Sequence, residues 1–148
     1  MSTPPSADAL KLEPDQVNAF LCRAFEIDEK DMFARVVEAR PGYACLVRRF
    51  DPASLRPGRL ISGPTLMALA DMAAYAQILA HIGEVAMAVT SSLTIHFLRG
   101  AKPGDLVAET HLLRLGRRSA TCEVRLWTEG PDRIAAHATV AYTIPSSS

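Results

Sequence analysis

Residues 62–83 read SGPTLMALADMAAYAQILAHIG, an apolar stretch in which Asp71 is the single formally charged side chain. Its apolar residues leave no polar face, which predicts a long helix that other structure surrounds on most sides. An ionised carboxylate in such a helix is costly unless it is paired or hydrogen-bonded, so we expect Asp71 to serve chemistry or a specific structural contact. The stretch is long enough to cross a membrane, but Asp71, Gln77 and His81 make it a poor span, and we interpret it as a core helix.

Both ends of this predicted helix carry residues that start and stop helices. Ser62 is a good N-cap, because its hydroxyl can accept a hydrogen bond from an amide of the first turn. Pro64 fits the first turn, where no N–H is needed, and Gly83 is the expected C-terminal stop. The free amides and the dipole at a helix N-terminus favour negative charge, so the N–H of Gly63 is a candidate oxyanion donor.

The composition indicates one domain of 148 residues, large enough for a hydrophobic core. We expect it to span residues 12–144, between flexible tails at 1–11 and 145–148. The chain has 16 basic and 16 acidic side chains, and this formal net charge of zero gives no indication of nucleic-acid binding. The N-terminus lacks the charged and apolar segments of a signal peptide. The three cysteines are Cys22, Cys45 and Cys122. Their spacing fits neither a disulfide framework nor a zinc site, and it suits a reducing, cytoplasmic compartment.

Periodicity outside the long helix predicts one further helix and several strands. Residues 13–25 are amphipathic and predict a helix, and a turn signal separates two strand-like runs, 32–39 and 43–50. After the long helix, four strand-like stretches joined by short turns predict an antiparallel meander. They are residues 89–98, 106–115, 119–128 and 134–144. We therefore predict an α+β fold in which a curved antiparallel sheet wraps around the long central helix, with an N-terminal helix in addition.

This order of elements resembles the hotdog fold, and in particular the acyl-CoA thioesterases of the hydroxybenzoyl-CoA and phenylacetate-pathway type. The resemblance is strongest in RPGRLISGPTLMALADMAAY (56–75), AVTSSLTIHFLR (88–99), LVAETHLLRLGRRSATCEVRLW (106–127) and AAHATVAYTI (135–144). In that family a loop with a His-Gly-Gly type motif precedes the helix, and an acidic residue follows within the helix. Here Ser62-Gly63-Pro64 occupies the motif, and Asp71 lies eight residues beyond Gly63, at the family spacing.

The resemblance implies roles for these residues. Gly63 would supply its backbone N–H as the oxyanion donor, Asp71 would act as nucleophile or general base, and Thr90, with Ser91 beside it, would position water. Relatives form dimers in which two sheets join edge to edge, so the resemblance implies a homodimer or a dimer of dimers with sites at the subunit interface. Gly63 and Asp71 of one site would then come from different subunits.

The remaining predicted contacts follow from the chemistry of an acyl-CoA. CoA carries phosphates, and the basic turn at Arg117 and Arg118, which aligns with a basic turn common in relatives, is the predicted phosphate contact. The residues expected at the motif and along the acyl pocket are Ser62, Pro64, Leu66, Met67, Tyr75 and Phe97. The chain departs from the family pattern in the loop before the helix. Several relatives carry Asn or Gln there, whereas residues 54–57 read SLRP and contain no amide side chain.

These observations predict a thioesterase that hydrolyses an acyl-CoA thioester to the free acid and CoA, without a metal or another cofactor. Two other interpretations stay open. The missing loop amide is compatible with a non-catalytic acyl-CoA-binding hotdog module. A hotdog dehydratase or hydratase is less favoured, because those enzymes need a His in the loop before the helix and residues 54–57 contain none. No membrane or nucleic-acid partner is expected.

Overall fold

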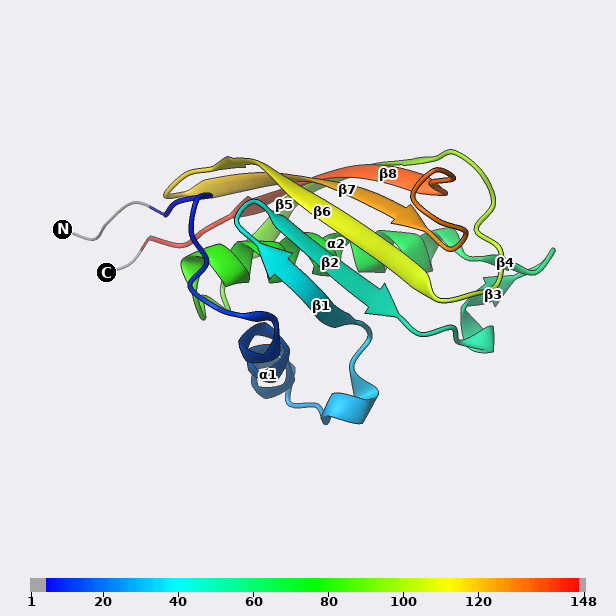
Figure 1. Cartoon of the computed structure of the whole chain (residues 1–148), viewed down its shortest axis with the longest axis horizontal. Coiled ribbons are helices and arrows are strands. Elements are labelled where there is room, and N and C mark those ends of the chain that lie inside the picture. The colour runs from blue at the N-terminus through cyan, green and yellow to red at the C-terminus, as the bar shows by residue number, and fades with distance from the viewer. Residues whose placement is uncertain (1–4, 147–148) are drawn as a thin grey trace.

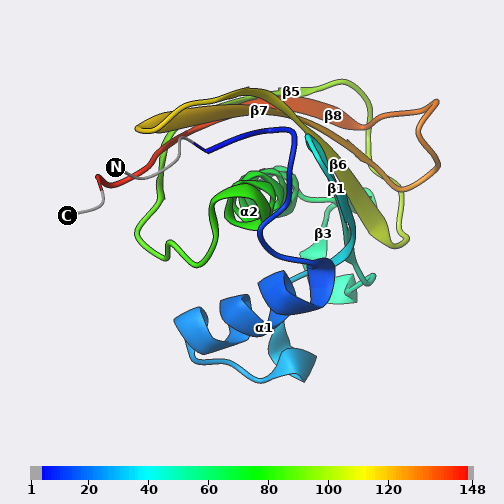
Figure 2. The same cartoon turned by 60° about the vertical axis from the view of Figure 1, so that its left-hand side comes forward.

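A six-stranded antiparallel sheet curves around one long helix, α2 (Gly63–Ile82), in the computed structural model, which describes residues 5–146. The shorter helix α1 (Pro14–Phe25) lies on the side of α2 that the sheet leaves open (Figure 1, Figure 2). This arrangement confirms the predicted α+β architecture, with a curved sheet around a central helix and an N-terminal helix in addition.

The sheet has the spatial strand order β1-β2-β6-β7-β8-β5. The strands are β1 (Arg35–Arg40), β2 (Tyr43–Arg48), β5 (Val89–Phe97), β6 (Leu106–Leu115), β7 (Ser119–Trp127) and β8 (Ala136–Thr143). Two short strands, β3 (Leu55–Arg56) and β4 (Leu60–Ile61), pair with each other outside this sheet. Short 3-10 helices occupy Glu29–Asp31 and Pro52–Ser54.

The predicted meander is correct for β6, β7 and β8 but wrong for β5. Strand β5 does not pair with β6, the next strand along the chain. It pairs with β8, from Val89 opposite Thr143 to Phe97 opposite Ala136, and forms one edge of the sheet (Figure 2). Strand β6 lies beside β2 instead. Alternation along a strand identifies its buried face but not its neighbour, because backbone hydrogen bonding is the same for every pair of strands.

Helix α2 begins and ends where its caps predict. The hydroxyl of Ser62 accepts a hydrogen bond from the N–H of Thr65 at 3.3 Å. Gly83, with a φ of 94°, donates its N–H back to the last helical turn at 2.8 Å. The strand predicted over 32–39 starts later, at Arg35, because the chain first forms a 3-10 helix that redirects it.

Helix α2 is the centre of the hydrophobic core. Twelve of its 20 residues are buried, and Ala70, Ala73 and Ala74 let the sheet approach closely because they have almost no side chain. Among the described residues α2 is long and apolar enough to cross a membrane, but 67% of the relevant window is buried inside the fold. Asp71 is partly buried, and it lies on the side of α2 that faces α1 and β5.

The N-terminal segment contacts the core before α1 begins. Leu10 packs against the core, and the N–H of Lys11 donates to the carbonyl of Ala80 in α2 at 2.8 Å. Part of the segment predicted as a tail over 1–11 is therefore attached to the central helix. Residues 1–4 and 147–148 of the predicted tails lie outside the described residues.

Candidate active site

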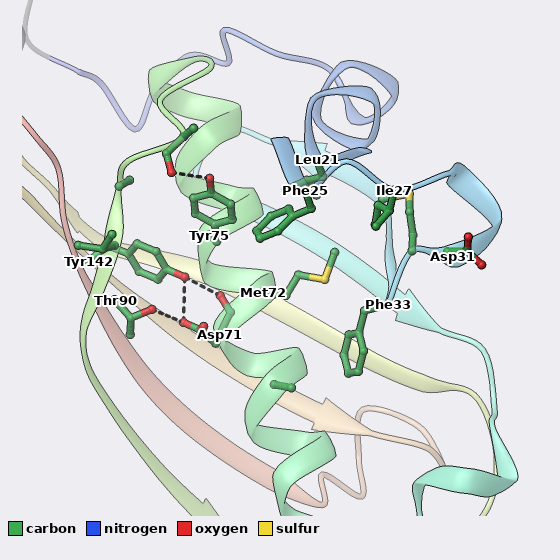
Figure 3. Close-up of a pocket in the computed structure, with 15 residues that line it drawn as sticks. Leu21, Phe25, Ile27, Asp31, Phe33, Asp71, Met72, Tyr75, Thr90 and Tyr142 are labelled. Carbon is green, nitrogen blue, oxygen red and sulfur yellow. Dashed lines mark hydrogen bonds between the residues drawn. The ribbon is translucent and has the colours of Figure 1, made fainter. Parts of the chain in front are cut away.

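Two hydroxyl groups converge on one carboxylate oxygen of Asp71 (Figure 3). Thr90 Oγ1 donates to Asp71 Oδ1 at 2.6 Å, and the phenol of Tyr142 donates to the same oxygen at 2.8 Å. The Tyr142 hydroxyl also lies 3.2 Å from the main-chain carbonyl oxygen of Asp71. Within residues 5–146, the second oxygen, Oδ2, accepts no hydrogen bond. Hydrogen bonds therefore fix the carboxylate through Oδ1 and leave Oδ2 available for another partner.

Strand pairing explains why both hydroxyls reach Asp71. Thr90 on β5 lies opposite Tyr142 on β8, and residues paired across antiparallel strands point to the same face of the sheet. That face is the one that packs on α2. A β-bulge between Thr90 and Ser92 interrupts the register immediately afterwards. Ser91, predicted to contact substrate, is the extra residue of this bulge and is exposed, and it makes no side-chain hydrogen bond within residues 5–146.

Tyr142 remains a hydrogen-bond donor over the whole physiological pH range. Burial and the nearby negative charge of Asp71 raise the pKa of Tyr142 far above its ordinary value. Its ring stacks on Tyr75, with ring centroids 5.7 Å apart and planes inclined by 16°. Burial also raises the pKa of Tyr75, whose hydroxyl donates to the carbonyl oxygen of Ala86 at 2.9 Å. The two phenols thus form a protonated pair beside the carboxylate.

A cavity of about 810 Å³ opens beside Asp71 (Figure 3). Asp71, Thr90 and Tyr142 lie at one end of it, and side chains from α1 and the segment after α1 lie at the other. The remaining lining residues are Ala68, Met72, Tyr75, Ala86, Ala88 and Val89. Of the residues predicted to form an acyl pocket, Tyr75 is the one found here.

Gly63, Leu66, Met67 and Phe97, which are also predicted site residues, lie at or near the N-terminal end of α2, away from this cavity. Gly63 precedes Asp71 by eight residues of continuous helix, which corresponds to about 12 Å along the helix axis. Leu66 is 3% exposed and belongs to the hydrophobic core. Met67 and Phe97 are partly exposed, and neither lines the cavity. Within a single chain, the predicted oxyanion donor, the N–H of Gly63, is therefore far from the predicted carboxylate of Asp71.

One amide is available as a donor at the start of α2. Gly63 is the first helical residue, so its N–H has no intrahelical acceptor, and Pro64 has no N–H at all. The N–H of Thr65 is already bonded to the hydroxyl of Ser62. A Cβ atom at position 63 would lie 3.3 Å from Cζ of Phe97, so the ring of Phe97 packs directly over this end of the helix. Among the described residues, the Gly63 amide therefore has no hydrogen-bond acceptor, and it lies beside the apolar ring of Phe97.

Arg117 and Arg118 lie in the tight turn between β6 and β7. The carbonyl oxygen of Arg118 accepts the N–H of Ile144 at 2.9 Å, which ties the turn to the end of β8. Across residues 5–146, neither arginine forms an ion pair with a carboxylate. Ala120, two residues further on, pairs with Tyr142, which in turn pairs with Thr90. The unpaired positive charge is therefore at the same end of the sheet as the Asp71 carboxylate.

Sequence reasoning missed Tyr142 and the wall that the N-terminal segment contributes to the cavity. Tyr142 could have been found, since it continues the series Ala136, Ala138 and Val140 on the buried face of its strand. A phenol on a buried face needs a hydrogen-bond partner. The N-terminal wall carries no such signal, because nothing local reveals which part of the fold an amphipathic helix covers. The described residues contain no group of three or more His, Cys, Asp or Glu side chains that could hold a metal ion.

Comparison with known proteins assigns the family. A sequence model of the thioesterase superfamily matches residues 58–135, which span α2, β5, β6 and β7. The chain belongs to the thioesterase superfamily, and its fold is the hotdog fold. Family membership supports hydrolysis of thioesters as its general activity. No curated protein sequence gives a significant match to the chain.

Solved structures of similar proteins agree with this assignment. A protein from Silicibacter sp. TM1040, provisionally named a thioesterase, is 33% identical, covers 94% of this chain and 96% of its own, and superposes with a TM-score of 0.84. A mutant of the phenylacetic acid degradation protein PaaI from Thermus thermophilus is 25% identical, covers 78% of this chain and 96% of its own, and gives a TM-score of 0.67. Zebra fish thioesterase superfamily member 2 is 19% identical, covers 91% of this chain and 100% of its own, gives a TM-score of 0.77, and supports the fold alone.

Proposed function

We propose that the protein hydrolyses acyl-CoA thioesters to the free acid and CoA, with Asp71 as the reacting carboxylate. The observation that carries this proposal is the environment of Asp71. Within residues 5–146, one of its oxygens accepts hydrogen bonds from Thr90 and Tyr142 and the other accepts none, and an apolar cavity large enough for an acyl group adjoins it. The two hydrogen bonds to Oδ1 fix the carboxylate, so that Oδ2 can act on a group bound in the cavity.

Two routes of hydrolysis use this arrangement. As a general base, Oδ2 of Asp71 takes a proton from water, the water oxygen attacks the acyl carbon, the C–S bond breaks and the CoA thiolate takes up the proton. As a nucleophile, Oδ2 attacks the acyl carbon and expels CoA thiolate, and water then hydrolyses the mixed anhydride. A single turnover in ¹⁸O-water shows one form of the second route, because label in Asp71 requires attack of water on the Asp71 carboxyl carbon of an anhydride. Label in the released acid alone fits the general base and also attack of water on the acyl carbon of the anhydride. Trapping with hydroxylamine separates these two cases, because it converts an anhydride into a hydroxamate.

Hydrolysis also needs a donor for the developing oxyanion, and we propose the amide of Gly63 of the partner subunit. Reacting groups must come within roughly 3–3.5 Å of one another, which a separation of about 12 Å along one helix does not allow. The Gly63 amide and the Asp71 carboxylate of one chain therefore belong to different sites. Bringing a second copy against the first would pair each Asp71 with an amide from the other chain.

The free edge of β5 is the surface that we propose for this pairing. Edge strands of native proteins are normally short, charged or covered, because their unpaired backbone groups invite another strand. Strand β5 has nine residues and no charged Lys, Arg, Asp or Glu side chain. Beside this edge, Met87 is 70% exposed, Phe97 53% and Leu98 56%. A second copy pairing along β5 would cover these apolar side chains and join the two sheets.

Arg117 and Arg118 are the proposed contact for the phosphates of CoA. Both guanidinium groups lack a carboxylate partner within residues 5–146, and their turn lies at the Asp71 end of the sheet. Guanidinium groups bind phosphate through two parallel hydrogen bonds, which suits them to the nucleotide part of CoA. The acyl part would then extend past Asp71 into the cavity.

Release of free thiol from acyl-CoAs tests the function directly. We expect turnover by the wild type and a loss of at least about a hundredfold in kcat for Asp71→Asn, since the amide can neither accept the proton nor attack. Circular dichroism and thermal unfolding of the variant control for its fold. Acyl-CoA binding without thiol release by the wild type would instead support a non-catalytic binding module.

A further inference from the structure

The far wall of the cavity comes from a segment that lies outside the family match. Asp71 and Thr90 are at the near end, and the far end is formed by α1 and the segment that follows it (Figure 3). The apolar far-wall residues are Leu21, Phe25, Ile27, Met32 and Phe33. All of them precede the matched residues 58–135. The part of the chain that matches the family thus supplies the reacting carboxylate, while the N-terminal segment shapes the space beyond it.

Two of these residues are exposed apolar side chains. Phe25 is 61% exposed and Ile27 is 38% exposed, although both line the cavity. Glu26 between them is left-handed, with a φ of 53°, and this turn at the end of α1 lets both neighbours face the cavity. The ring of Phe25 meets Tyr75 edge to face at a centroid distance of 6.3 Å. Apolar groups arranged around an open cavity are typical of a ligand site.

Phe33 on the same wall is held in place by Arg48. The Arg48 guanidinium lies 4.0 Å above the ring of Phe33, and its Nη1 donates to the carbonyl oxygen of Phe33 at 2.8 Å. In contrast, Met32 and Met72 carry unbranched thioether side chains that adapt to the shape of a ligand. One fixed aromatic and two adaptable side chains suit a flexible apolar group better than a flat ring of defined shape.

The far end offers almost no polar partner. Asp31 is the only polar side chain that the described residues contribute to the far wall, and it is exposed at the rim. The hydroxyl of Tyr75, nearer to Asp71, is already bonded to Ala86. A hydroxylated aromatic acyl group would need a hydrogen-bond partner for its own hydroxyl on burial. A saturated chain has no such requirement.

We propose that the acyl group is a saturated straight chain of about 8 to 14 carbons, lying between α1 and α2 with its thioester at Asp71. This inference depends on the proposed acyl-CoA substrate. A methylene group occupies about the volume of a liquid water molecule, roughly 30 Å³, so a 12-carbon chain needs about 360 Å³. The cavity of about 810 Å³ holds such a chain and leaves room at its mouth. A short acyl group would contact only the Asp71 end.

Kinetics across a chain-length series test the proposal. Thiol release is measured for acetyl- to hexadecanoyl-CoA and for phenylacetyl-CoA, below the micellar concentration of each. Full burial of a methylene contributes about fourfold in affinity, so we expect kcat/KM to rise at least about a hundredfold from butanoyl to dodecanoyl. A flat profile, or a maximum at butanoyl- or phenylacetyl-CoA, would overturn the chain-length assignment while leaving the thioesterase function intact.

Variants of the far wall test whether α1 sets this preference. We expect Phe25→Ala to reduce the dodecanoyl-to-butanoyl ratio of kcat/KM about tenfold, because it removes apolar surface beyond the reach of the short chain. Ile27→Trp fills the far end of the cavity, so the acyl chain length that gives the highest kcat/KM should become at least two carbons shorter. Val37→Ala is the matched control, since Val37 is 54% exposed on β1 and does not line the cavity. Equal profiles for all four proteins would overturn the role of the N-terminal wall.

A binding measurement separates this inference from the proposed catalysis. Calorimetry with Asp71→Asn follows the affinity for butanoyl-, octanoyl- and dodecanoyl-CoA in the absence of turnover. Affinity that rises with chain length and falls in Asp71→Asn/Phe25→Ala would support the acyl site even if the wild type released no thiol. Affinity independent of chain length would overturn it even if the wild type were an active thioesterase.

Discussion

Tyr142 and Asp71, 71 residues apart along the chain, are joined by a hydrogen bond of 2.8 Å from the phenol to the carboxylate oxygen Oδ1. Thr90 donates to the same oxygen, so strands β5 and β8 together orient a carboxylate that belongs to the central helix. This geometry makes the orientation of Asp71 depend on two hydroxyls that need not touch the substrate.

The first prediction concerns these two hydroxyls. Tyr142→Phe keeps the shape of the ring but removes one donor, and hydrogen bonds to charged groups contribute about 1.5–3 kcal/mol, so we expect kcat to fall about 10- to 100-fold with little change in KM. Thr90→Val should act similarly, and Thr90→Ser should restore most of the loss. Because both donors share Oδ1, the double variant should lose less than the product of the two single losses.

Tyr75→Phe is the matched control for this prediction. It also removes a phenol hydroxyl beside the cavity, but that hydroxyl donates to the carbonyl of Ala86 and not to Asp71. If Tyr75→Phe lowered kcat as much as Tyr142→Phe, orientation of Asp71 would not be the cause of either loss.

The second prediction tests the site shared between two subunits. Gly63→Pro removes the free N–H at the first position of α2, where proline is tolerated, and the preceding Ser62 already has the extended backbone that proline requires, with φ −67° and ψ 149°. A Cβ atom at this position lies 3.3 Å from Cζ of Phe97, so Gly63→Ala, which adds the Cβ but keeps the N–H, is the matched control. Loss of one oxyanion donor costs about 3 kcal/mol, so kcat should fall by roughly a hundredfold. Mixing Gly63→Pro with Asp71→Asn after unfolding and refolding should restore roughly a quarter of wild-type activity, because half of randomly formed dimers contain one intact site.

Complementation is specific to a shared site. If both groups acted within one chain, every site in the mixed dimers would carry one of the two defects, and mixing would restore nothing. Analytical ultracentrifugation of each variant controls for its ability to form dimers.

The third prediction concerns the CoA phosphates. Replacing Arg117 and Arg118 together by Ala removes two exposed positive charges, each of which contributes up to about 1 kcal/mol in water. We expect KM for an acyl-CoA, relative to KM for the N-acetylcysteamine thioester of the same acid, to rise about three- to tenfold. The effect should shrink at high ionic strength. The exposed Arg49 serves as control, and an equal change in Arg49→Ala would indicate a general effect of net charge.

The fourth prediction concerns the pH dependence of stability. His81 is 1% exposed, its Nε2 accepts the N–H of Gly42 at 2.9 Å, and its Nδ1 lies 2.8 Å from the carbonyl oxygen of Gln77. This pattern corresponds to the neutral ring with its proton on Nδ1. Burial lowers the pKa of His81, although its hydrogen bond to the Gln77 carbonyl opposes the change. The folded state therefore binds a proton less readily than the unfolded state.

The sign of the effect follows from that difference. Above a pH of about 6.5, the ordinary pKa of histidine, the ring is neutral in both states and its contribution is complete. As the pH falls below this value, the unfolded chain takes up a proton first, so the free energy of unfolding decreases. Urea unfolding should show that the free energy of unfolding decreases more steeply between about pH 8 and pH 5 for the wild type than for His81→Gln. Parallel curves would mean that His81 does not couple protonation to folding.

Much of the fold is determined by local patterns in the sequence. The apolar residues of α2, its Ser62 cap and its Gly83 stop specify a buried helix, because capping and burial act within a few residues of each position. Alternation also identified the long strands β6, β7 and β8. The position of Asp71 in α2 and its spacing from Gly63 are likewise sequence properties.

The tertiary structure alone decided what surrounds Asp71. Strand β5 lies beside β8 and not beside β6, and only this pairing brings Thr90 and Tyr142 to one carboxylate oxygen. Similarly, the cavity beyond Asp71 exists because α1 covers the open side of α2, which leaves Phe25 at its wall. Helix caps and periodicity report interactions between near neighbours in the chain. Strand partners and cavity walls depend on contacts between distant segments, whose backbone hydrogen bonds carry no information about which segments will meet.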